Sequence, residues 1–224
     1  MATYHYESSL FLRSSGNNPT ANAQSNANAL YDVFSQCDNR FSHTVDDNYL
    51  VFDNKFRIEL TQSSNNIRLN CTKLDGTVIL AKDSGLAYDS ERYVNIYITP
   101  YLFYCYFTKN GSKESNLFIY SKGDDYYYGV GNTNGSLPDS LTDIVNINSL
   151  PASATYSIQK ISQKALSSYV MFSSNCLLVA DGGTFTVLDT LKSCSNVPAL
   201  STISVNNVNY LAIGTNTLIE APTS

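Results

Sequence analysis

The sequence predicts a mainly β protein, made of antiparallel hairpins or a meander in a sandwich or barrel-like form, with one short N-terminal α-helix. From Tyr49 onward apolar residues alternate with polar ones, which is the period of half-buried strands. Turn-forming pairs such as Asn110-Gly111 separate the alternating segments, and such pairs reach the positive φ that two-residue hairpins require. One segment near the N-terminus shows the helical period instead.

The helical segment carries its apolar residues on one face. Leu30, Phe34, Cys37 and Phe41 follow one another at intervals of four, three and four residues, which predicts a helix over about residues 27–40. Such a helix is too short to be stable alone. It must pack on a sheet or on a partner, and we predict these four residues as an interface with a neighbouring subunit.

Residues 14–29, before this helix, are rich in Asn, Ser and Ala and contain no large apolar residue. Such a segment buries too little surface to offset the entropy lost on ordering. It is predicted to be an extended arm, either disordered or ordered against a neighbouring subunit. We therefore expect an arm-and-helix region over 1–48.

Alternation and turns divide the rest of the chain. Phe56, Ile58 and Leu60 are one example of alternation, and turns are predicted at Asp53-Asn54 and Asp75-Gly76. Residues 131–140 are turn-rich and predict a boundary between a β-meander domain over 49–135 and a C-terminal β domain over 136–224. The two domains are either separate or packed as one unit.

Composition limits the function classes. Charged residues make up 15% of the chain and the net charge is −5, against roughly 25% charged residues in ordinary domains. No basic cluster occurs, which disfavours direct nucleic-acid binding and an anionic membrane surface. No apolar run is long enough to insert into a membrane. The first residues also lack the features of a signal peptide, so we expect synthesis in the cytoplasm.

Candidate catalytic groups are few. His43 has Asp46 and Asp47 nearby but no nucleophile turn. Asp124 and Asp125 are the best candidates for a carboxylate pair, yet neighbouring side chains on an extended chain point apart. We therefore predict that the protein is not an enzyme.

Metal and cofactor sites are also not expected. Gly129, Val130 and Gly131, with Gly135, resemble a phosphate loop only faintly, because no helix or lysine follows. The five cysteines form no CxxC pair and are predicted to be buried free thiols. The four carboxylates that come nearest to a calcium set lack the spacing of a calcium loop, and they are Asp124, Asp125, Asp139 and Asp143.

The tyrosines are the most informative residues about binding. The chain contains 17 tyrosines and no tryptophan. Tyrosine offers rigid contact area and a hydroxyl group, which suits interfaces and sugar stacking, although cross-strand packing also favours it. Tyr104 and Tyr106 share one strand face. The candidates for contact with a glycan or protein partner are Tyr104, Tyr106, Tyr126, Tyr127 and Tyr128.

The Asn/Ser-rich N-terminal segment, the short helix, the tandem hairpins and the ending Ile203 to Glu220 (ISVNNVNYLAIGTNTLIE) resemble structural proteins of bacteriophages and phage-tail-like particles. The resemblance implies a non-catalytic, homo-oligomeric component of a tail or baseplate that binds other particle subunits and leaves the cell by lysis. The alternatives are a module that binds host-surface glycan and a hydrolase of cell-wall polysaccharide that uses Asp124 or Asp125.

Overall fold

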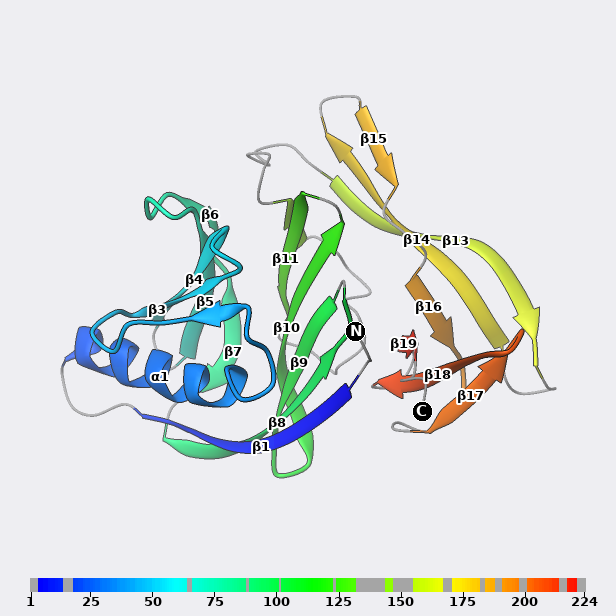
Figure 1. Ribbon diagram of the computed structural model, residues 1–224. Helices are drawn as coiled ribbons and strands as arrows, with labels where there is room; N and C mark the ends of the chain where they lie inside the picture. Colours follow the sequence, from blue (N-terminus) through cyan, green and yellow to red (C-terminus); the bar gives the residue numbers. More distant parts are fainter. Residues whose placement is uncertain are drawn as a thin grey trace.

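The computed structural model describes residues 4–13, 18–63, 66–87, 89–100, 102–122, 124–131, 144–146, 155–166, 171–181, 184–187, 191–197, 201–213 and 217–220. These residues form a helix and three antiparallel sheets (Figure 1). The prediction of a mainly β fold with antiparallel sheets and a single helix is confirmed. No helix among these residues has the length and apolar character needed to cross a membrane.

The central sheet has the strand order β1-β8-β9-β10-β11-β12. Its strands are β1 (Tyr4–Leu12), β8 (Ser90–Ile98), β9 (Leu102–Lys109), β10 (Ser112–Lys122), β11 (Asp125–Gly131) and β12 (Ile144–Asn146).

The flanking sheet has the order β2-β3-β4-β5-β6, with β7 also paired to β5. Its strands are β2 (Phe41–Ser42), β3 (Tyr49–Phe52), β4 (Phe56–Ser63), β5 (Asn66–Thr72), β6 (Val78–Leu80) and β7 (Asp83–Ala87).

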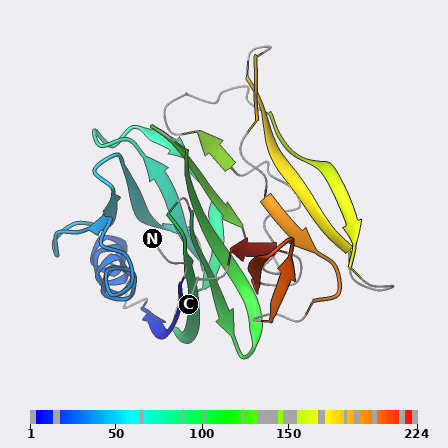
Figure 2. The same ribbon diagram turned by 45° about the vertical axis from the view of Figure 1, so that its right-hand side comes forward.

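The C-terminal sheet has the order β13-β14-β16-β19-β18-β17, with β15 also paired to β14. In both views it lies on the side of the central sheet away from the helix (Figures 1 and 2). Its strands are β13 (Thr155–Ala165), β14 (Met171–Asp181), β15 (Thr184–Val187), β16 (Leu191–Cys194), β17 (Thr202–Val205), β18 (Val208–Ile213) and β19 (Thr217–Glu220).

Helix α1 (Pro19–Phe34) begins earlier than predicted, inside the segment expected to be an extended arm. Asn18 caps its start by accepting a hydrogen bond from the Ala21 amide at 3.1 Å, and Pro19 suits the first helical position. The small residues Ala23 and Ala27 are buried, so the helix approaches the sheets closely. This packing supplies the stability that the local composition lacks, and residues 14–17 lie outside the described part.

The main core lies between the central and flanking sheets, with α1 against it. Four phenylalanine rings join the three elements. The Phe103 ring of the central sheet lies 5.0 Å from Phe34 of the helix and 4.8 Å from Phe41, measured between centroids. Phe52 of β3 lies 4.9 Å from Phe41. Helix and sheets therefore share one core.

The turns follow the predicted chemistry. Asp53, Asn54 and Asn110 have φ between 51° and 53°, and Gly76 and Gly111 have φ of 88° and 77°. These are left-handed conformations that asparagine, aspartate and glycine adopt most readily. The hairpin turns β3–β4, β5–β6 and β9–β10 are therefore located as expected, whereas the predicted boundary over 131–140 lies almost entirely outside the described residues.

Strand β1 lies in a segment for which the sequence analysis predicted no strand. It pairs with β8 over nine residues, from Tyr4 opposite Ile98 to Leu12 opposite Ser90. The N-terminal residues thus form the edge of the central sheet, beside a strand far away in the sequence.

Candidate functional site

The four residues predicted as a helix interface are buried inside the chain. Leu30 and Phe34 lie on α1, Cys37 follows the helix and Phe41 lies in β2. Their exposed fractions are 0%, 1%, 7% and 4%, and all four belong to the main core. Their expected role as a surface for a neighbouring subunit is corrected: this face packs on the chain's own sheets, because the sandwich supplies the apolar cover that the helix needs.

Tyr126 and Tyr128 point into the same core. The Tyr128 hydroxyl donates to the backbone oxygen of Leu69 at 2.7 Å, and the Tyr126 hydroxyl donates to the Asp53 carboxylate. Burial raises the pKa of Tyr128 well above its ordinary value. Neither ring is available to stack on a sugar, so for these two the expected partner contact is replaced by core packing.

Tyr104, Tyr106 and Tyr127 lie on the opposite face of the central sheet, together with Tyr97 and Tyr120. Tyr97 stacks on Tyr106 with a centroid distance of 6.2 Å, and Tyr120 lies 6.4 Å from Tyr127. All five rings are at least 91% buried. They form a second aromatic layer inside the molecule, so the packing interpretation of the tyrosines holds for Tyr104, Tyr106 and Tyr127 as well.

His43 connects the helix to the flanking sheet. Its Nδ1 lies 2.7 Å from the backbone oxygen of Tyr49, and its Nε2 lies 2.5 Å from Oδ1 of Asn28 on α1. The backbone oxygen of Asp46 accepts from Gln24 of α1 at 2.6 Å, so this loop is held to the helix twice. Both ring nitrogens of His43 thus serve structural contacts.

Among the described residues, no group of three His, Cys, Asp or Glu residues converges as a metal site would require. Asp124 is exposed and close enough to Tyr126 for its charge to help raise the pKa of that phenol. The Asp125 side chain and Asp139 and Asp143 lie outside the described part.

The glycines of the supposed phosphate loop belong to strand β11. A Cβ on Gly131 would lie 2.8 Å from Oδ1 of Asn116 on β10, so a close approach between strands explains the glycine. Gly135 lies outside the described residues.

Four cysteines are buried free thiols, and they are Cys37, Cys71, Cys105 and Cys194. Burial raises the pKa of Cys37 to about 12 and raises those of Cys71 and Cys105 as well. These three side chains therefore stay protonated at neutral pH and act as small apolar groups.

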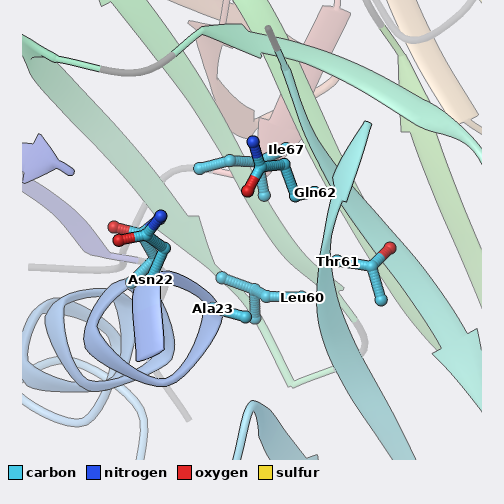
Figure 3. Close-up of a pocket in the computed structure, with 7 residues that line it drawn as sticks. Asn22, Ala23, Leu60, Thr61, Gln62 and Ile67 are labelled. Atoms are coloured by element: carbon cyan, nitrogen blue, oxygen red, sulfur yellow. The ribbon is translucent and has the colours of Figure 1, made fainter. Parts of the chain in front are cut away.

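A small cavity lies between the helix and the flanking sheet (Figure 3). Asn22, Ala23 and Asn26 line it from α1, and Leu60 and Ile67 line it from β4 and β5. Its volume is about 10 Å³, which is close to the minimum for one water molecule. It has no room for a substrate or an organic cofactor.

The surface feature that the sequence patterns missed lies on β1 and β8. Phe11 is 48% exposed and Tyr93 is 60% exposed. Ser9 pairs with Tyr93 and Phe11 with Glu91, so the two rings are diagonal neighbours on one face. The Arg13 guanidinium lies 5.9 Å from the Phe11 ring centroid. We call Phe11, Arg13, Glu91 and Tyr93 the Phe11 patch; alternation within Tyr4–Leu12 was the signal that could have revealed it.

Comparison with protein-family models, curated proteins and solved structures finds no match to this chain.

Proposed function

We propose that this protein is a non-catalytic structural component of a phage virion or phage-tail-like particle, and that it acts in a tail or baseplate by assembling with other particle subunits. The observation that carries the proposal is the Phe11 patch. It sets two exposed aromatic rings beside one positive and one negative side chain at the edge of the central sheet. Exposed aromatic residues and arginine are typical of protein–protein interfaces.

The composition supports the same function. Only 15% of the residues are charged, so contacts with other subunits depend little on ionic strength. The sequence resemblance to phage structural proteins suggests which kind of assembly is meant. Of the two alternatives, glycan binding loses most of its support, because Tyr104, Tyr106 and Tyr126–Tyr128 are buried. The hydrolase alternative has no observation that favours it over assembly.

The test is to purify intact particles from the organism that encodes the chain. Quantitative mass spectrometry is expected to find the chain in fixed proportion to the other particle proteins, and gold-labelled antibodies are expected to mark one position on the particle. A chain found only in the soluble fraction would contradict the proposal.

A matched pair of variants tests the surface. Tyr93→Glu places a charge in the Phe11 patch and is expected to reduce incorporation into particles. Val45→Glu is the control, because Val45 is 70% exposed and lies away from the central sheet in a loop. Equal incorporation of both variants would exclude the Phe11 patch as the assembly surface.

A further inference from the structure

The Phe11 patch has a regular arrangement on one face of the central sheet. Phe11 and Arg13 lie on this face along β1, and Glu91 and Tyr93 lie on it along β8. All four residues are exposed, whereas Leu10, which points to the other face, is 3% exposed and belongs to the main core. The patch is therefore a surface feature of a sheet whose other face is packed inside the chain.

Phe11 occupies the corner of this arrangement. Glu91 is its direct cross-strand neighbour, at the usual strand spacing of about 4.8 Å. Arg13 follows two residues later, just past the end of β1, which corresponds to about 6.8 Å along the strand direction. Its guanidinium lies 5.9 Å from the Phe11 ring centroid. The positive and the negative side chain therefore flank the same ring at similar distances, in directions nearly at right angles.

Such an arrangement is complementary to itself. A two-fold axis that crosses Phe11 between these two directions exchanges the positions of Arg13 and Glu91, as an isologous interface requires. Two copies that pack face to face about this axis bring their Phe11 rings together, and each Arg13 meets the Glu91 of the other copy. Tyr93 of one copy then lies toward the Arg13 side of the other copy, where it adds aromatic contact.

We propose that the Phe11 patch packs face to face on the Phe11 patch of a second copy of this chain about this two-fold axis. The two Phe11 rings form the central contact, and two Arg13–Glu91 pairs, one on each side, fix the orientation. This inference rests on the proposed function and deepens it, because it names the first partner in assembly.

Charge complementarity favours a second copy as the occupant. An unrelated partner would need an acidic and a basic group at matching places, whereas a second copy supplies both through symmetry, and two-fold dimers are the commonest homo-oligomers. Both views place the C-terminal end of β1 away from the C-terminal sheet (Figures 1 and 2), so that sheet leaves this end of the face accessible. Interfaces below about 1,200 Å² are usually transient, so a patch of four residues predicts a weak dimer.

The first test uses the full chain without substitutions. Sedimentation over a concentration series is expected to show a monomer–dimer equilibrium. Hydroxyl-radical footprinting read out by mass spectrometry locates the contact over the same series, because it labels exposed side chains. Labelling of Phe11 and Tyr93 should fall as the dimer forms, while labelling of Val45, which is 70% exposed in a loop, should not change.

Charge reversal tests the pairing itself. Arg13→Glu sets two acidic groups against each other at each contact, and Glu91→Arg does the same with two basic groups. Each variant alone should dimerise at least about tenfold more weakly, because the axis turns two attractive pairs into two repulsive ones. An equal mixture of the two variants should recover the dimer, since each contact again joins opposite charges. Lys55→Glu, in the exposed turn between β3 and β4, is the control and should dimerise like the parent.

Three results would overturn the proposal. One is charge-reversed variants that dimerise normally or a mixture that fails to recover the dimer. Another is a dimer in which Phe11 and Tyr93 remain fully labelled, and this result requires no variant to fold. The third is a chain that stays monomeric at every concentration. If such a monomer is still found in purified particles in fixed proportion, the proposed assembly function holds and only the partner is wrong.

Discussion

The Tyr128 hydroxyl, on the central sheet, donates a hydrogen bond across the sandwich to the Leu69 backbone oxygen of the flanking sheet at 2.7 Å. Both residues are at most 1% exposed, so water cannot replace either partner. The bond fixes the spacing of the two sheets and places one polar group of each sheet in the middle of an apolar core. Inside such a core, a lost hydrogen bond is costly.

We therefore expect Tyr128→Phe to lower the free energy of unfolding by about 1–2 kcal/mol, because it removes the donor and keeps the ring. Urea denaturation measures the change. Tyr93→Phe is the matched control: its ring is 60% exposed, and its loss should stay within about 0.5 kcal/mol. Equal losses in the two variants would show that the Tyr128 bond does not stabilise the fold.

The tyrosines also show what the sequence could predict. Alternation correctly placed Tyr104 and Tyr106 on one face of a strand, because side-chain direction in a strand is a local property. Whether that face meets solvent, a partner or another part of the chain depends on distant segments. The same holds for β1, whose partner β8 begins at Ser90.

The helix shows a different limit. Leu30 and Phe34 were correctly assigned to one apolar face, but the helix begins at Pro19 rather than near Ala27. The residues before Leu30 carry little apolar surface, so periodicity gave no signal there. Their helical state depends on close packing of Ala23 and Ala27 against the sheets, which a composition argument does not include.

Phe34 is the helix residue on which this packing depends most. Its ring lies 5.1 Å from Phe41 and 5.0 Å from Phe103, measured between centroids. Phe34→Ala should lower the free energy of unfolding by about 3–5 kcal/mol, since it leaves a cavity among these rings. Chemical denaturation of the dilute chain measures it, with the exposed Val45→Ala as control. A loss below about 1 kcal/mol would mean that the helix is not packed in the isolated chain.

Arg92 and Glu114 form an ion pair between β8 and β10, with 2.6 Å between Nε and Oε2. The Arg92 side chain is fully buried, while that of Glu114 is 22% exposed. Removing the carboxylate leaves a buried positive charge with less compensation, so Glu114→Ala should cost about 3 kcal/mol. Glu114→Gln keeps an acceptor and should cost less. The exposed Glu91→Ala is the control, and thermal unfolding that ranks all three equally would contradict the expectation.

Stability should also fall at alkaline pH. Burial raises the pKa of Cys37 to about 12, and burial together with the bond to Asp53 raises the pKa of Tyr126 to about 12. In the unfolded chain these groups lose their protons near pH 8.5 and about 10. The unfolded state then binds fewer protons than the folded state, so the free energy of unfolding decreases as the pH rises from about 9 toward 12.

Urea midpoints measured between about pH 8 and about pH 11 test this dependence. Tyr126→Phe should lessen the decrease above about pH 10, and Cys37→Ala the decrease that begins near pH 9. Part of the decrease should remain in each variant, because burial also raises the pKa values of Tyr128, Cys71 and Cys105. Midpoints in the parent that stay constant over the range would contradict the burial of both groups.

Asn26 connects helix α1 to the residue that follows strand β1 at the edge of the central sheet. Its side chain is 2% exposed and holds both the amide and the carbonyl of Arg13. Asn26→Ala should cost about 2 kcal/mol, since two buried bonds are lost, and the Arg13 amide should then exchange rapidly with solvent. Ser25→Ala, on the exposed side of α1, should leave both properties unchanged. Continued protection of the Arg13 amide in Asn26→Ala would show that another group closes the edge.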